Sequence, residues 1–305
     1  MSLYTRLALR GPDGFGYRST AEEVTAGLSL ATRRILITGC NSGLGLEALR
    51  VLALRGAHVF GAARTLEKAQ SACAAVGGGT SAVACELTDP GSVAGCIATV
   101  RSAGPLDAVI CNAGIMAPRQ LQQAHGYELQ FFANHIGHFM LVTGLLDHLT
   151  AQGRIVMVSS TAHRRAPREG IQFDNLSGEH GYRPFTAYGQ SKLANLLFAK
   201  ELARRLGTGG RSALAVHPGV IATHIGRHLA GGAELFFALG SLLFFKNIPQ
   251  GAATQCFAAV HPRAAALSGA YLADCQVTAP RADAQDPALA RRLWEVSEQI
   301  VARLH

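Results

Sequence analysis

The sequence predicts an α/β fold in which helices cover both faces of a doubly wound parallel sheet. Short apolar runs, rich in β-branched residues, alternate along the chain with segments of helical periodicity. A glycine-rich turn joins the first run directly to a helical segment. The 305 residues, 49% of them hydrophobic, are enough for one large core. The expected strands span 34–38, 57–62, 81–85, 106–111, 154–159, 211–216 and 270–273.

The chain divides into a short N-terminal extension, residues 1–32, and a single domain, residues 33–305. The extension carries Ser19 and Glu22 at the spacing of a capping box, which predicts a short helix packed on the domain. It has neither the apolar core nor the cleavage pattern of a secretory signal, so the expected location is cytoplasmic.

The net charge of +8 raises the question of nucleic-acid binding. Lys and Arg are scattered, and their densest cluster, residues 163–168, has no basic helix or interleaved aromatic motif. We therefore expect no nucleic-acid partner. A basic surface and a ligand that carries phosphates account for the charge more simply.

The cysteines and histidines do not predict a metal site. Seven cysteines without close Cys-x-x-Cys pairs indicate reduced thiols, mostly in the core. His135 and His138 are spaced as two metal ligands can be, but the sequence places no third ligand. We expect them to be ordinary helix histidines and expect no metal.

The first predicted strand, residues 34–38, runs into the glycine turn Gly39–Gly45, which a helical pattern follows. Glycines permit positive φ and allow the backbone to approach a pyrophosphate, whose charge the helix N-terminus favours. A merely tight connection is the alternative. The strand before the turn and the helix after it favour dinucleotide binding over that alternative.

Tyr188 and Lys192 lie four residues apart, on one face of a predicted helix. A lysine cation beside a tyrosine stabilises the phenolate, and so lowers the phenol pKa from its usual value of about 10. The pair can therefore form a proton donor. By itself the spacing is a weak signal, because exposed helices carry it by chance.

Together, Thr38–Gly45 (Thr-Gly-x-x-x-Gly-x-Gly) and Tyr188–Lys192 (Tyr-x-x-x-Lys) resemble the short-chain dehydrogenase/reductase family. The resemblance covers about residues 33–275, and the stretch 187–195 is similar to the retinol-dehydrogenase-like and WW-domain-oxidoreductase-like subgroup. It implies a Rossmann fold and an oxidoreductase that interconverts a carbonyl and an alcohol. Further family marks follow in order: Asn112-Ala113-Gly114, Asn134, Ser159-Ser160, Pro218-Gly219 and Thr223.

The resemblance implies four catalytic residues. Tyr188 is the general acid or base, and Lys192 both lowers its pKa and hydrogen-bonds the nicotinamide ribose. Ser160, at the carboxyl end of a strand, holds the substrate oxygen, while strand alternation turns Ser159 away. Asn134 holds a water that links the lysine to solvent, although an asparagine in an apolar helical stretch can also simply bond the backbone.

The cofactor site that the resemblance implies is assembled from several loops and departs from the family pattern at one position. Glu86, with a longer side chain, stands where the family usually has aspartate to hold the adenine ring. The implied residues are Gly39, Asn41, Ser42, Gly43, Leu44, Gly45, Arg64, Glu86, Leu87, Asn112, Ala113, Gly114, Tyr188, Lys192, Pro218, Gly219 and Thr223.

The end of the second predicted strand indicates which coenzyme is preferred. A site that prefers NAD has an acidic residue there, which accepts hydrogen bonds from the ribose 2′-hydroxyl. This chain has Ala63 at that position and Arg64 next to it. A guanidinium with no repelling carboxylate suits a 2′-phosphate, so we expect NADP(H). A surface arginine at a strand end is the alternative.

The substrate is expected to be a hydrophobic carbonyl or alcohol. Residues 233–245 are rich in Leu and Phe and are too short to span a bilayer. We interpret them as a lid; a weak membrane contact, core packing or a homo-oligomer contact are the alternatives. The 27 residues between Ser160 and Tyr188 are expected to form part of the substrate mouth. Two other functions remain open: reduction of a conjugated double bond, and non-catalytic cofactor sensing.

Overall fold

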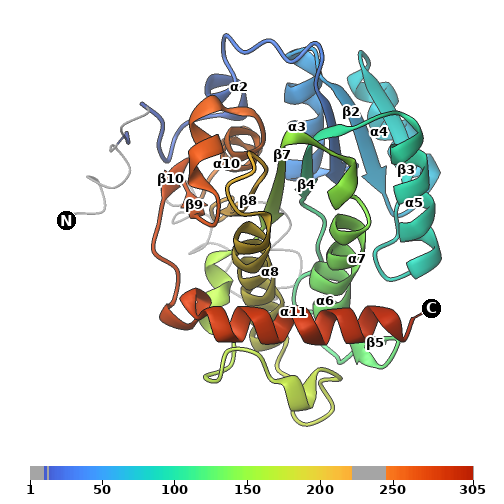
Figure 1. Ribbon diagram of the computed structural model, residues 1–305, viewed down its shortest axis with the longest axis vertical. Coiled ribbons are helices and arrows are strands. Elements are labelled where there is room, and N and C mark those ends of the chain that lie inside the picture. The colour runs from blue at the N-terminus through green and yellow to red at the C-terminus, as the bar shows by residue number, and fades with distance from the viewer. Residues whose placement is uncertain (1–9, 12–13, 222–244, 305) are drawn as a thin grey trace, which may run out of the picture.

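The computed structural model describes residues 10–11, 14–221 and 245–304, and its centre is an eight-stranded sheet (Figure 1). The strand order is β10-β9-β8-β7-β4-β1-β2-β3. Neighbours are parallel from β9 to β3, and β10 joins β9 antiparallel. The bounds are β1 Arg34–Thr38, β2 His58–Ala63, β3 Thr80–Ala84, β4 Leu106–Cys111, β7 Leu149–Val158, β8 Ser212–His217, β9 Tyr271–Ala273 and β10 Gln276–Val277.

This topology confirms the predicted doubly wound parallel sheet. The chain builds outward from β1 through β2 to β3, and then crosses back to build outward in the other direction from β4. The order therefore reverses between β1 and β4, the point at which open α/β sheets bind ligands beyond the carboxyl ends of their strands.

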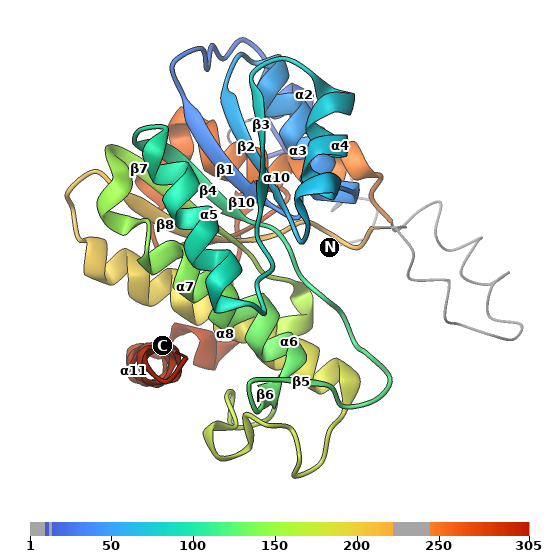
Figure 2. The same cartoon turned by 90° about the vertical axis from the view of Figure 1, so that its right-hand side faces the viewer.

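Helices cover both faces of the sheet, as Figure 2 shows. One apolar core lies beneath α5, α7, α8 and α11, and the other beneath α2, α3, α4 and α10. The helix bounds are α2 Ala21–Val24, α3 Gly43–Leu54, α4 Leu66–Val76, α5 Pro90–Ser102, α6 Leu129–Phe131, α7 Gly137–Thr143, α8 Pro184–Leu206, α10 Ile248–Val260 and α11 Pro287–Ala302. A π-helix spans Phe132–Ile136, and short 3-10 helices span Leu146–His148, Thr161–Arg165, Phe173–Asn175, Pro262–Leu267 and Ala282–Gln285.

The observed strands agree with the predicted ones within about two residues, with two exceptions. β7 begins at Leu149, five residues before its predicted start, because polar and glycine residues in its first half hide the strand pattern. A hairpin of β5 (Gln123–Ala124) and β6 (Tyr127–Glu128), as well as edge strand β10, was not predicted. Two-residue strands carry too little alternation to be recognised from sequence.

The N-terminal extension contains the expected short helix, α2, but its cap differs by one residue from the prediction. The capping box is formed by Thr20 and Glu23, whereas Ser19 and Glu22 were predicted. Glu22 instead forms an ion pair with Arg50 of α3. Two capping boxes of equal spacing overlap in this sequence, and the predicted pair has other partners, since the Ser19 hydroxyl accepts the Gly16 N–H at 3.0 Å.

Two further features concern the cysteines and the lengths of the helices. All seven cysteines are buried, which agrees with the prediction that they lie mostly in the core. Among the residues that the structure describes, no helix is long and apolar enough to cross a membrane.

Candidate active site

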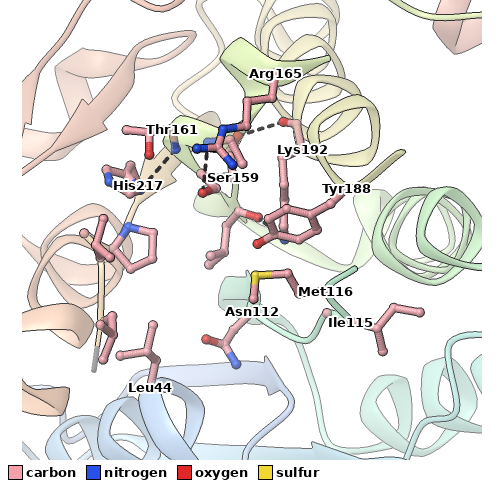
Figure 3. Close-up of a pocket in the computed structure, with 18 of the residues that line it drawn as sticks. Leu44, Asn112, Ile115, Met116, Ser159, Thr161, Arg165, Tyr188, Lys192 and His217 are labelled. Carbon is pink, nitrogen blue, oxygen red and sulfur yellow. Dashed lines mark hydrogen bonds between the residues drawn. The ribbon is translucent and has the colours of Figure 1, made fainter. Parts of the chain in front are cut away.

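A pocket of about 440 Å³ opens at the carboxyl ends of the central strands (Figure 3). Strand ends β4, β7 and β8 contribute to it, together with α3, the start of α8 and the 3-10 helix Thr161–Arg165. Its lining residues are Leu44, Asn112, Gly114, Ile115, Met116, Val158, Ser159, Ser160, Thr161, Ala162, Arg165, Phe185, Tyr188, Lys192, His217, Pro218, Gly219, Val220 and Ile221. The pocket thus brings together predicted residues that are far apart in the sequence.

The glycine turn lies between β1 and α3 as predicted. Gly39 and Gly43 have φ values of 69° and 54°, the left-handed region that glycine tolerates best. A Cβ at Gly45 would lie 2.0 Å from the carbonyl oxygen of Gly39, so close packing of the turn requires glycine there. The helix N-terminus that follows has no side-chain cap from Ser42, in contrast to α4, α5, α10 and α11, which are capped. Its free N–H groups suit an anion such as a pyrophosphate.

We predict that Gly45→Ala weakens cofactor binding, because the added methyl group cannot fit against the Gly39 carbonyl without moving the turn. Titration with NADPH, followed by nicotinamide fluorescence, measures the dissociation constant. Gly95→Ala in α5 is the matched control, since a Cβ there meets no atom within 4 Å. Equal affinity in both variants would contradict the assignment of the turn.

Asn112 fixes the loop after β4 against the glycine turn. Its Nδ2 donates to the Thr38 carbonyl at 2.9 Å, and its backbone N–H donates to the Thr38 hydroxyl at 3.0 Å. The Ala113 N–H donates to the same hydroxyl at 3.0 Å. This part of the predicted cofactor site is therefore held in place by the end of β1.

Tyr188 lies in the first turns of α8, with its ring facing the pocket (Figure 3). Ser160 also lines the pocket, and its hydroxyl accepts the Ala162 N–H at 3.1 Å. Ser159 is buried instead, and its hydroxyl donates to the Lys192 carbonyl at 2.7 Å, which ties α8 to the end of β7. The second serine of the pair therefore lies beside the tyrosine, as the strand alternation predicted.

Lys192 is buried beside Tyr188, with its Nζ 5.7 Å from the centre of the phenol ring. The ammonium donates to the carbonyl of Val158 at 3.0 Å. Burial lowers the pKa of Lys192 to about 8, because the charged form loses hydration.

The expected direction of the tyrosine pKa shift is wrong. Burial raises the pKa of Tyr188 to about 12, and the polar Ser160 side chain opposes this rise without outweighing it. The ammonium of Lys192 is directed to the Val158 carbonyl, so its proximity does not offset the desolvation of the phenolate. At neutral pH Tyr188 therefore holds its proton.

Asn134 lies in the π-helix Phe132–Ile136, which interrupts the helical stretch that was predicted around it. π-Helical turns occur frequently at functional sites. The buried Asn134 side chain accepts the Ile115 N–H at 2.8 Å and donates to the Ile115 carbonyl at 3.0 Å and to Ser191 Oγ at 2.9 Å. Ser191 in turn donates to the Tyr188 carbonyl at 2.8 Å. The asparagine thus joins the pocket wall to the helix that carries the tyrosine.

His138 is a neutral, buried link that the sequence interpretation missed. Its Nδ1–H donates to the Asn134 carbonyl at 2.9 Å, so its Nε2 is the acceptor for the Thr38 hydroxyl, also at 2.9 Å. Burial lowers the pKa of His138 to about 4. It connects the end of β1 with the π-helix. His138 lies four residues after Asn134, a spacing that places both on one face of a helix and could have predicted this link.

His135, the other histidine of the pair, faces α11, and its Nε2 lies 2.8 Å from Ser297 Oγ. Burial lowers its pKa to about 3. The two histidines therefore point to different partners. Within the described ranges no group of three or more His, Cys, Asp or Glu side chains is arranged to hold a metal ion.

Four more predicted cofactor residues lie after β2, in the glycine turn and after β3. Arg64 is exposed directly after β2, and Asn41 is exposed in the turn. Glu86 accepts the N–H and hydroxyl of Thr88, at 3.0 and 2.8 Å, so its carboxylate braces its own loop. Leu87 is buried against the backbone of Gly137.

The loop after β8 is in the pocket wall. Pro218 and Gly219 line the pocket, and a Cβ at Gly219, whose φ is 96°, would lie 2.6 Å from Lys246 Cδ. Thr223 lies outside the described residues, as does the predicted lid 233–245 apart from Phe245. His217, which was not predicted, lines the pocket and accepts the Thr161 N–H at 3.3 Å.

Comparison with known proteins identifies the family. Residues 33–232 match the family model described as short chain dehydrogenase. The chain is 41% identical to "Short-chain dehydrogenase TIC 32 A, chloroplastic" of Brassica napus, with 96% of each chain covered. It is 36% identical to human "Retinol dehydrogenase 14", over 89% of this chain and 87% of that protein.

Solved structures agree with the fold. A crystal structure of a protein from Mycobacterium Paratuberculosis matches with a TM-score of 0.74 and 33% identity, and covers 92% of this chain and 97% of that one. A blue fluorescent protein from a metagenomic library, crystallised with NADPH, matches with a TM-score of 0.65 and 25% identity, over 80% and 97% of the two chains.

Proposed function

We propose that this chain interconverts a carbonyl and an alcohol on a hydrophobic substrate with NADP(H). It belongs to the short-chain dehydrogenase/reductase family of oxidoreductases, and this membership is the premise of the proposal. One observation carries the proposal: Tyr188, Ser160 and Lys192 line a single pocket, with Asn134 in hydrogen-bonded contact with its wall. A general acid, a group that holds the substrate oxygen and a buried cation are what carbonyl reduction requires of the protein.

The residues of the cofactor side fit a nicotinamide dinucleotide. The uncapped start of α3 and the close Gly39–Gly45 packing suit a pyrophosphate, and Asn112 and Gly114 lie at the adjoining edge of the pocket. A Cβ at Gly114 would lie 3.3 Å from Lys192 Nζ, so the glycine leaves the approach to the ammonium open. When bound, the reduced nicotinamide supplies the hydride.

The protein's own part is to position the substrate oxygen and supply the proton. The Ser160 hydroxyl and the Tyr188 phenol converge on one oxygen atom of the substrate. As the carbonyl becomes an alkoxide, Tyr188 donates its proton to that oxygen. The buried Lys192 cation stabilises the phenolate that remains. In the reverse direction Tyr188 accepts the proton of the alcohol.

The apolar rim supports a hydrophobic substrate. Met116, Phe185 and Val220 line the pocket and are all exposed, although large apolar side chains are normally buried. Phe185 is one of the 27 residues between Ser160 and Tyr188, which were predicted to form part of the substrate mouth. The names of the retinol dehydrogenase relatives are consistent with such a substrate, but do not identify it.

NADP(H) is preferred in this proposal because Arg64 is exposed beyond β2 with no acidic residue at the strand end. Arg64→Ala should raise the Michaelis constant for NADPH by about tenfold, the lower range for losing a hydrogen bond to a charged group, since the site is exposed. The constant for NADH should change little. Steady-state kinetics with both coenzymes test this.

Arg291→Ala, on the exposed face of α11, removes the same charge far from β2 and serves as the control (Figure 1). A wild-type enzyme that favours NADH, or an Arg64→Ala variant with unchanged coenzyme preference, would refute the assignment of Arg64.

A further inference from the structure

Arg165 is a pocket residue that the proposed reaction does not use. It ends the 3-10 helix Thr161–Arg165, which begins directly after Ser160. Its side chain extends into the pocket on the side of Thr161 and His217, away from Leu44 and Asn112 (Figure 3). Tyr188 lies between these two ends of the pocket, so Arg165 is on the side away from the glycine turn.

The guanidinium of the exposed Arg165 lies over an aromatic ring and forms no ion pair with an acid of the described residues. Its Cζ lies 5.7 Å from the ring centre of Phe185. A guanidinium placed over a ring face keeps its in-plane N–H groups available for other acceptors. Among the described residues that line the pocket there is no aspartate or glutamate.

The other titratable side chains discussed for the pocket are either positively charged, as Arg165 is, or neutral. Lys192 is the second cation, and its ammonium is bound to the Val158 carbonyl. His217 is neutral at physiological pH, because burial lowers its pKa to about 4. The described wall of the pocket is therefore positive at its Arg165 end and apolar at Met116, Phe185 and Val220.

We propose that Arg165 binds an anionic group, a carboxylate or a phosphate, of an otherwise apolar substrate. The inference rests on the proposed function and specifies its substrate class: an amphipathic carbonyl compound whose anion is bound by the guanidinium while its reacting carbon lies at Tyr188. A planar guanidinium binds the two oxygens of such an anion with paired hydrogen bonds. Phe185, beneath the guanidinium, supplies the adjoining apolar contact.

The kinetic test uses an ω-oxo fatty acid and its methyl ester, which share the aldehyde and the chain but differ in charge. The wild-type enzyme should reduce the acid with the higher kcat/KM. Arg165→Gln should lower kcat/KM for the acid by about tenfold or more, the effect of losing a hydrogen bond between charged groups, and leave the ester unchanged. Equal losses on both substrates would overturn the proposal.

Arg164→Gln is the matched control, because the neighbouring Arg164 donates to the Ala279 carbonyl at 2.9 Å and does not line the pocket. It should leave the ratio of acid to ester unchanged. The dissociation constant for NADPH should be the same in Arg165→Gln and wild type. A weakened NADPH affinity would assign Arg165 to the cofactor and overturn the proposal.

Direct binding separates this inference from the proposed reaction. Titration calorimetry of the full chain with saturating NADP and a medium-chain alkanoate, or the matching alkyl phosphate, measures the anion site without turnover. Binding of either probe that Arg165→Gln abolishes supports the site and shows which anion it prefers. Binding of neither probe, or equal binding by the variant, would overturn it. If the anion binds but no carbonyl compound is reduced, the proposed reaction fails and the anion site stands.

Discussion

Tyr188→Phe is expected to lower the turnover of carbonyl reduction by about a hundredfold or more, the lower range for losing a general acid. The substitution removes only the hydroxyl, so the ring keeps its place in the pocket and the fold and cofactor affinity should be retained. Turnover is measured in steady state with NADPH and a hydrophobic aldehyde, and folding by thermal unfolding.

The control for this variant is Tyr182→Phe. Tyr182 donates to the Pro118 carbonyl at 2.7 Å and lies outside the residues that line the pocket. It should keep near wild-type turnover, although its loss of a hydrogen bond lowers stability by about 1 kcal/mol. If Tyr188→Phe retained near-normal activity, Tyr188 would not be the proton donor.

The raised pKa of Tyr188 predicts that the two directions of the reaction respond differently to pH. With a pKa of about 12 the phenol is protonated across the neutral range, which is the form that donates to a carbonyl oxygen. Oxidation of an alcohol needs the deprotonated form, whose population grows tenfold with each unit of pH below that value. Alcohol oxidation should therefore depend more steeply on rising pH than carbonyl reduction does.

The fold and the centre of the site were predictable because their signals are local. A strand, a glycine turn and a helix occupy consecutive residues 34–54, and each element constrains the next. Tyr188 and Lys192 share one helix, so their spacing alone places them together. The order of the remaining marks along the chain placed Asn112 and Ser160 at strand ends and Asn134 in a helical stretch.

The parts that sequence reasoning missed depend on tertiary contacts. The π-helix around Asn134 accompanies bonds to Ile115 and Ser191, which come from two other segments. The linking role of His138 depends on Thr38, a hundred residues earlier in the chain. The direction of the Tyr188 pKa shift depends on how far the phenol is desolvated, which no spacing reveals.

These contacts, which were not predicted, fix the part of the pocket at the end of β1 relative to the part formed by α8. Hydrogen bonds run from the Asn112 and Ala113 N–H groups to Thr38, and from Thr38 through His138 to the Asn134 carbonyl. The Asn134 side chain continues the chain of bonds toward α8. A buried network of this kind specifies a unique arrangement when all of its members are satisfied.

Lys192→Ala is expected to impair the enzyme in two ways. The loss of the buried cation removes the charge that stabilises the Tyr188 phenolate, so turnover should fall by about a hundredfold. The loss of the proposed contact to the nicotinamide ribose should also raise the dissociation constant for NADPH by about tenfold. Tyr188→Phe should show only the first effect, which makes the comparison of the two variants informative.

Lys200→Ala is the matched control for Lys192→Ala. Lys200 lies two turns later on α8, and its ammonium also donates to a backbone carbonyl, that of Gly269 at 3.1 Å, away from the pocket. It should leave both turnover and NADPH affinity unchanged. An unaltered NADPH dissociation constant in Lys192→Ala would refute the double role of the lysine.

The pH dependence of kcat/KM tests the role of the Lys192 ammonium independently. Burial lowers the pKa of Lys192 to about 8, so the ammonium is charged at neutral pH and loses its proton as the pH rises through that value. We expect kcat/KM for carbonyl reduction to fall above about pH 8 in the wild type, because the neutral amine no longer stabilises the phenolate. In Lys192→Ala this fall should disappear, while Lys200→Ala should keep it. A wild-type profile that stays flat well beyond pH 8 would show that the charge of Lys192 does not assist the proton transfer.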